Sequence, residues 1–190
     1  MTTRSKPDAD DSGQMTPSAA QVLRDGKAAG SWVLDASRTE IRLKSKSMWG
    51  LVPVKGVFRQ VSGNGTVSAS GDVTGTITVA AQSIDTGHDK RDEHLRSGDF
   101  FDVDTYPVIT FTVDEVTAPG NGLTVAGQLS VRGRTRPMSF DMSVSRFDGR
   151  EAHLDGELHV NRADFGLIWN RLGAASMNNT ITVRAVFTRQ

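Results

Sequence analysis

The residues best suited to chemistry gather in one stretch, residues 83–101, with the sequence SIDTGHDKRDEHLRSGDFF. The stretch holds two of the four histidines of the chain, His88 and His94, together with several carboxylates and arginines. These two histidines fit neither the i, i+4 spacing of a zinc pair on a helix nor the i, i+2 spacing of a pair on a strand. We therefore predict no metal site in this stretch.

The charges of the same stretch are of both signs. Arg91 and Arg96 lie among aspartates and glutamates, which is typical of the solvated surface of a helix. Asp89 is suited to cap the start of such a helix, and Gly98 is suited to end it in the left-handed conformation. We predict a short charged helix that runs from Asp89 to about Ser97.

A second polar cluster lies on a predicted strand. His153 and His159 share their strand parity with Asp155 and Glu157, and the residues between them are mostly apolar. These residue types could hold a metal, but the outward face of a half-buried strand explains them without one. We predict that this face points to solvent.

Other signatures of catalysis and of nucleic-acid binding are absent from the sequence. The chain has no cysteine, which excludes disulfides, thiolate nucleophiles and Cys-ligated metals. It also has no G-x-S-x-G elbow and no P-loop. Arg132, Arg134 and Arg136 form a small basic cluster, but Lys+Arg and Asp+Glu balance at 22 each and no aromatics interleave. We predict a non-enzymatic protein with no catalytic residue, no metal, no cofactor and no nucleic-acid partner.

At 190 residues the chain is long enough for one domain with a substantial core. Its first residues, MTTRSKPDADDSGQMTPSAA, are rich in Pro, Ser, Asp and Thr, so we predict a disordered tail over residues 1–29 and one domain over residues 30–190. No segment reaches the ~18 apolar residues of a membrane span, and the N-terminus lacks the apolar core of a signal peptide. We therefore expect a cytoplasmic protein without a membrane span.

The dominant pattern after residue 30 is an alternation of apolar and polar residues, typical of half-buried strands. Met138, Phe140, Met142 and Val144 show it most clearly. The same pattern recurs at 41–43, 73–79, 109–113, 123–131, 154–160 and 181–187. The segment 161–179 lacks this alternation, and we predict a turn or short helix there.

Turn signals separate the predicted strands. Asn64-Gly65, Asn121-Gly122 and Asp148-Gly149 favour short hairpins, because type I′ turns need positive φ at both central residues. Strands joined in succession by hairpins form an antiparallel meander, and closing a long meander into a barrel removes its exposed edges. We therefore predict an all-β antiparallel barrel.

Five segments occur in order along the chain. They are WVLD at 32–35, GVF at 56–58, IDTGHDKRDEHLRSGDFFDVDTYP at 84–107, GQLSVRG at 127–133 and RADFG at 162–166. In this order they resemble the YceI-like family, lipocalin-like proteins described as polyisoprenoid-binding. The resemblance implies an eight-stranded antiparallel barrel, an interior that holds the apolar tail of an isoprenoid lipid, and a short helix near the open end.

The interior should then be lined by the apolar parity of the strands, with irregular segments framing the entrance. We expect binding, storage or transport of a polyprenyl chain or an isoprenoid quinone, driven by burial of hydrocarbon at ~0.8 kcal/mol per CH₂. The predicted ligand-binding residues are Ile84, Phe111, Leu129, Met138, Phe140, Met142, Leu158 and Val183 in the interior, with Trp49, Phe165 and Trp169 at the entrance.

Two alternatives stay open at this point. One is an enzyme that acts on a lipid-like substrate through Asp92, His94 and Arg96; the other is a barrel that binds a fatty acid or an amide. Whether the protein forms a homodimer also stays open. The sequence shows no interface that would decide it.

Overall fold

The computed structural model describes residues 18–47, 51–120, 122–170 and 175–190. The described chain is mostly strand, and its elements follow one another in a long antiparallel meander. The strands are β1 Gly30–Leu34, β2 Glu40–Ser47, β3 Val52–Phe58, β4 Val61–Val67, β5 Val73–Ala80, β6 Ile84–Asp85, β7 Val108–Thr117, β8 Gly122–Val131, β9 Arg134–Phe147, β10 Glu151–Asn161 and β11 Asn178–Arg189. The helical elements are α1 Ala19–Arg24, η1 Ala81–Ser83, α2 Asp89–Arg96 and η2 Arg162–Phe165.

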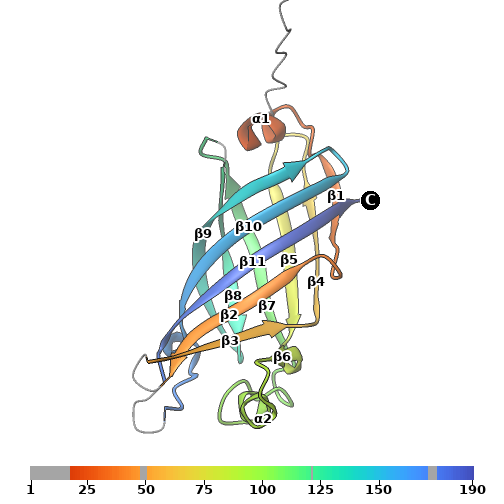
Figure 1. The fold of residues 1–190 in the computed structure, drawn as a ribbon. Coiled ribbons are helices and arrows are strands. Elements are labelled where there is room, and N and C mark those ends of the chain that lie inside the picture. The colour runs from red at the N-terminus through yellow and green to blue at the C-terminus, as the bar shows by residue number, and fades with distance from the viewer. Residues whose placement is uncertain (1–17, 48–50, 121, 171–174) are drawn as a thin grey trace, which may run out of the picture.

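The strands close into a barrel (Figure 1). The ring runs β1-β4-β5-β7-β8-β9-β10-β11, and β11 returns to β1 through the pairs from Trp32↔Arg189 to Leu34↔Phe187. The other half of β11 pairs with β2, from Thr180↔Lys44 to Arg184↔Glu40, so β1 and β2 lie end to end along one neighbour. The predicted eight-stranded antiparallel barrel with a short helix near one end is confirmed.

The strand alternation places one set of side chains inside the barrel. In β9, the outward Ser139 and Asp141 are exposed, whereas Phe140 is partly buried and Met142 is buried. The buried apolar side chains of the ring form one core cluster, which includes Val79, Val125 and Val183. Barrel closure therefore turns the period-two pattern of the sequence into a continuous apolar interior.

A hairpin is confirmed at Asp148-Gly149, whereas the prediction at Asn121-Gly122 falls partly outside the described residues. Loops join β7 to β8 and β9 to β10, where Gly149 has φ +82°; Asn121 itself lies outside the described residues. The prediction at Asn64-Gly65 is wrong, because both residues lie inside β4 and pair with Thr76 and Gly75 of β5. A Cβ at Gly65 would stand 2.9 Å from the carbonyl oxygen of Thr74, so here the glycine permits close strand contact rather than a turn.

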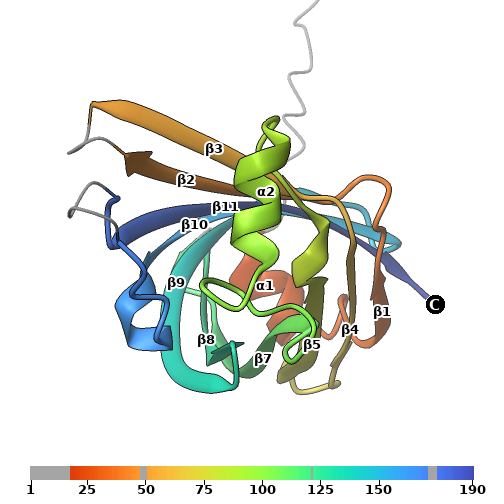
Figure 2. The same ribbon diagram turned by 90° about the horizontal axis from the view of Figure 1, so that it is seen from below.

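The two ends of the barrel are covered by helices (Figures 1 and 2). Helix α1 lies at one end, and α2 crosses the other, where the view from below shows it in front of the strands. Residues 18–29, which the tail prediction included, are ordered: Ser18 caps α1, and Ala19, Val22 and Ala28 are buried. The tail therefore ends earlier than residue 29, because apolar contacts with the barrel hold this segment; residues 1–17 lie outside the described residues.

Helix α2 confirms the predicted charged helix but not its caps. His88 is the N-cap, with Nδ1 accepting from the backbone N–H of Arg91 at 3.4 Å, and Ser97 is the C-cap. Gly98 does not have positive φ; the left-handed residue of the following turn is Asp102, at φ 51°. The N–H of Asp102 donates to the carbonyl of Ser97 at 2.9 Å, so the chain reverses later than predicted.

Candidate functional site

The barrel encloses a cavity of about 500 Å³. Its wall is built mostly from inward apolar side chains of the strands, including Ile77 of β5, Phe111 of β7 and Phe140 of β9. The rings of Phe111 and Phe140 lie 5.4 Å apart between centroids, tilted by 58°. The cavity is thus continuous with the core of the barrel and reaches from the α1 end to the α2 end.

Seven of the predicted ligand-binding residues line this cavity. They are Phe111, Leu129, Phe140, Met142, Leu158, Phe165 and Val183. Strand parity brings six of them together, and Phe165 joins from η2, where it is 2% exposed. That they contact a ligand stays a prediction.

Three of the predicted residues that the structure describes do not contribute to the wall as expected. Ile84 is fully buried and Met138 is partly buried against the core, but neither lines the cavity. Trp169 is 39% exposed and lies outside the wall. Trp49 lies outside the described residues.

The sequence reasoning missed the part of the wall at the α1 end. Val22 and Leu23 of α1 and Trp32 of β1 line the cavity there. Trp32 packs with Val22 and Ala28 in a second apolar cluster, and its Nε1 donates to the carbonyl of Ala28 at 2.8 Å. Ala19, Val22 and Leu23 have the i, i+3, i+4 spacing of an apolar helix face, and this signal could have found the helix.

A buried arginine at the α2 end was also missed. Arg162 is 4% exposed and lines the cavity. Its guanidinium donates to the carbonyls of Ser176 and Trp169, each at 2.9 Å, and to that of Leu167. Its charge stands 5.4 Å from the ring centroid of Phe100. None of the ion pairs between described residues includes Arg162.

The contacts of Arg162 explain its burial. Burial alone lowers the pKa of the guanidinium from its ordinary value, and the backbone carbonyls satisfy its donors in place of a carboxylate. Because these carbonyls belong to the segment that connects η2 to β11, the arginine clamps that segment against the barrel and holds Leu167 in the cavity wall.

Helix α2 is fastened to the barrel by its charged side chains. The carboxylate of Asp92, 5% exposed, accepts from the backbone N–H of Thr86 at 3.0 and 3.1 Å and from the Thr86 hydroxyl. Arg91 donates to the hydroxyl and the carbonyl oxygen of Thr86 at 2.7 and 2.9 Å. Arg96 donates to carbonyls of η1 and β6 at 2.8 and 2.7 Å. Three charges expected on a solvated helix face therefore hold the helix in place.

His94 makes a different contact. Its ring packs against the ring of Trp169, with centroids 4.2 Å apart, and its Nε2 is buried without a hydrogen-bond partner among the described residues. Asp92 and Arg96, the other members of the alternative catalytic set, are bonded to Thr86 and to the backbone of η1 and β6. No hydrogen bond between described residues joins any two of these three side chains.

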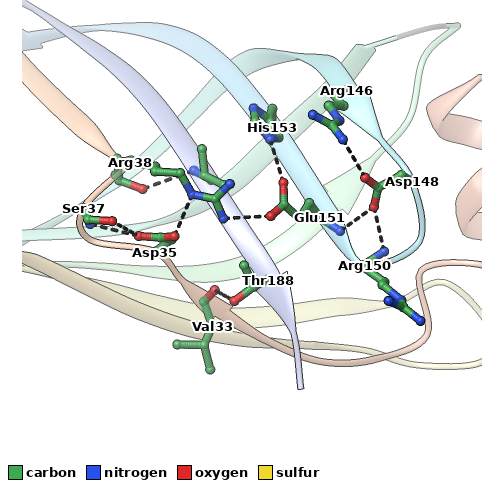
Figure 3. A network of polar contacts seen from close by, with 12 residues as sticks. Val33, Asp35, Ser37, Arg38, Arg146, Asp148, Arg150, Glu151, His153 and Thr188 are labelled. Carbon is green, nitrogen blue, oxygen red and sulfur yellow. Dashed lines mark hydrogen bonds and ion pairs between the residues drawn. The ribbon is translucent and has the colours of Figure 1, made fainter.

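A polar network on the outer surface joins the β1–β2 connection to the start of β10 (Figure 3). Arg38 donates to Asp35 at 2.7 Å and to Glu151 at 2.8 Å, and His153 Nε2 lies 3.3 Å from the Glu151 carboxylate. Hydrogen bonds, first from Ser37 and then from Arg38, lower the pKa of Asp35 to about 2. Hydrogen bonds from Arg38, and then from His153, lower the pKa of Glu151. None of these five side chains is part of the cavity wall.

In the part of the chain that the structure describes, no group of three or more His, Cys, Asp or Glu is placed to hold a metal ion. No helix of that part is long and apolar enough to cross a membrane. His159, on the polar face of β10, is 77% exposed at its side chain, in agreement with the predicted outward face.

Solved structures share this architecture. BcnA of Burkholderia cenocepacia aligns with a TM-score of 0.73 at 24% identity, over 80% of this chain and 98% of its own. A polyisoprenoid binding domain from Saccharophagus degradans, implicated in plant cell wall breakdown, aligns with a TM-score of 0.69 at 19% identity, over 84% and 98%. At these identities the likeness supports the fold.

Sequence comparisons identify relatives and a family. A UPF0312 protein of Pseudomonas aeruginosa is 33% identical over 119 residues, 60% of this chain, so the chain spans 62% of that relative. A UPF0312 protein of Vibrio parahaemolyticus is 31% identical over 157 residues, 78% of this chain and 83% of that protein. The family model described as YceI-like domain matches residues 32–188, which confirms the resemblance seen in the sequence. The chain therefore belongs to the YceI-like family.

Proposed function

We propose that this protein binds an amphiphilic isoprenoid lipid, a polyprenyl chain or an isoprenoid quinone, in the barrel cavity, and stores or transports it without catalysis. The observation that carries the proposal is the apolar cavity of about 500 Å³, a size within the ~300–1,000 Å³ of small-molecule sites. The description of the Saccharophagus degradans neighbour as a polyisoprenoid binding domain supports the same ligand class by analogy.

The composition of the wall fits such a ligand. Most of the residues that line it are apolar, and the polar ones include Ser18 near the α1 end and the buried Arg162 at the α2 end. A long apolar chain with a short polar end matches this distribution. Each buried CH₂ contributes ~0.8 kcal/mol, and Met142 offers an adaptable surface to a flexible chain.

The direct test is mass spectrometry of organic extracts from the purified full-length protein, with a matched pair of variants. Phe140→Asp places a charge in the cavity, and Ser139→Asp places the same charge on the exposed face of the adjacent residue. We expect an isoprenoid lipid with the wild type and with Ser139→Asp, and none with folded Phe140→Asp. Lipid that still co-purifies with folded Phe140→Asp would contradict the assignment.

A second variant covers the case in which Phe140→Asp does not fold. Ile181→Trp adds an uncharged ring to the cavity wall, and we expect it to fold and to carry less lipid or a shorter chain. The same extracts separate the other cargo classes, because a fatty acid or amide in place of an isoprenoid would overturn the ligand class. Turnover of an added lipid that is lost in His94→Ala would instead indicate an enzyme.

A further inference from the structure

Four of the six exposed large apolar side chains among the described residues lie in two segments at one end of the barrel; the other two are Val33 of β1 and Val108 of β7. Leu51 is 80% exposed and Val52 40%, both where β3 begins. Ile168 is 68% exposed and Trp169 39%, both in the segment after η2. Figures 1 and 2 show the end of β2 and the start of β3 beside the start of β11, at the α2 end of the barrel.

Hydrogen bonds tie these two segments into one surface. The N–H of Ser176 donates to the carbonyl of Lys46 at 2.8 Å, which attaches the segment before β11 to β2. The guanidinium of Arg162 donates to both Ser176 and Trp169. These hydrogen bonds therefore fix the positions of the apolar residues of the two segments relative to each other.

The outer face of the paired strands β2 and β3 carries unpaired positive charge. Lys44 and Lys55 are direct cross-strand partners, and Lys46 follows on the same exposed face. Like charges at opposed positions destabilise a sheet, and none of these lysines forms an ion pair with a described residue. The only acidic residue between positions 40 and 58 is Glu40, which pairs with Arg42.

We propose that this end docks the protein on the surface of an anionic lipid bilayer. The docking surface consists of Lys44, Lys46, Lys55, Leu51, Ile168 and Trp169. The exposed apolar side chains insert at the boundary between headgroups and acyl chains, where tryptophan is enriched. The lysines attract anionic lipids. Lysine is depleted in protein–protein interfaces, so an unpaired lysine face beside exposed apolar side chains favours a bilayer over a protein partner.

The docking surface adjoins the covered end of the cavity. The ring of Trp169 packs against His94 of α2, with 4.2 Å between centroids. Docking therefore presents the α2 end of the barrel to the bilayer, where a lipid could pass between membrane and cavity. The docking itself does not depend on the identity of the cargo, and it is measured without any isoprenoid.

Vesicle flotation tests the proposal with the full chain. We expect binding to vesicles of phosphatidylcholine and phosphatidylglycerol in equal parts, weak binding to phosphatidylcholine alone, and release by added salt. The triple variant Lys44→Gln, Lys46→Gln, Lys55→Gln should weaken binding roughly a hundredfold. A control with the same change of net charge, Arg24→Gln, Lys27→Gln, Arg150→Gln, alters exposed residues of α1, the loop after it and the β9–β10 loop and should bind like the wild type.

A fluorescent probe reports which end touches the bilayer. The chain has no cysteine, so Leu51→Cys and Arg150→Cys can each carry one environment-sensitive dye. We expect a blue shift on vesicle binding for the dye at position 51 and none at position 150. No binding of the wild type to anionic vesicles, equal loss in both triple variants, or a shift only at position 150 would overturn the proposal. Self-association lost in the first triple variant, without vesicle binding, would assign the surface to a second copy instead.

Discussion

The Arg162 clamp is the contact whose loss should most change the α2 end of the cavity. Arg162→Met keeps the apolar stem but removes donors to the carbonyls of Leu167, Trp169 and Ser176. Each hydrogen bond from a charged group contributes ~1.5–3 kcal/mol, and each buried carbonyl left without a partner costs ~1–3 kcal/mol. Relief of the buried charge offsets part of this, so we expect the free energy of unfolding to fall by about 3–5 kcal/mol.

Denaturant unfolding of the purified variant, followed by tryptophan fluorescence, measures this loss. Arg184→Met is the matched control, since the Arg184 side chain is 69% exposed and lies 3.7 Å from Asp155; it should cost less than ~1 kcal/mol. Arg162→Lys keeps the charge but not the forked set of donors. Its loss in free energy of unfolding should lie between those of Arg162→Met and Arg184→Met. A loss below ~1 kcal/mol in Arg162→Met would show that the carbonyls find other partners and that the clamp is not needed.

Two further predictions concern the barrel wall and its surface. Because the folded-state pKa of Asp35 is about 2, below its ordinary value, the stability that this carboxylate adds at neutral pH is lost as the pH falls towards 2. Asp35→Asn should flatten the dependence of the denaturant midpoint on pH in that range, and an unchanged slope would contradict the assignment. Gly127→Ala should destabilise by ~1–3 kcal/mol in thermal unfolding, since the new Cβ would lie 2.7 Å from Phe111 Cζ and clash with the carbonyl of Thr112. Gly98→Ala, with its nearest neighbour atom at 4.0 Å, should change little, and equal effects of the two would refute the steric argument.

The barrel was predictable because its signal is local and repeated. Each strand carries its own alternation, and in β9 the exposed Asp141 and the buried Met142 reproduce the expected faces. The failure at Asn64-Gly65 has a specific cause: a dipeptide suited to a turn also permits two strands to approach closely. Only the partner strand, which supplies the Thr74 carbonyl, decides between these uses.

The cavity was predictable in its middle and not at its ends. Strand parity selects residues such as Leu129 and Val183, whereas each end depends on contacts between segments far apart in the sequence. Arg162 escaped notice because a charged side chain is normally exposed, and its backbone acceptors leave no trace in the sequence. Asp92 was misplaced on the solvated face for the same reason, since its acceptor role toward Thr86 appears only after folding.

The size of the cavity is itself an argument for an occupant. Protein interiors are close-packed, with few voids larger than a water molecule, so a mostly apolar cavity of this size is unusual. Wall residues like Leu158 and Phe111 border about 500 Å³ of such space. The proposed hydrocarbon chain would make dispersion contacts with them and would stabilise the folded state by mass action. The thermal midpoint of protein treated to remove lipid should therefore rise on adding an isoprenoid quinone, and it should not rise in folded Phe140→Asp.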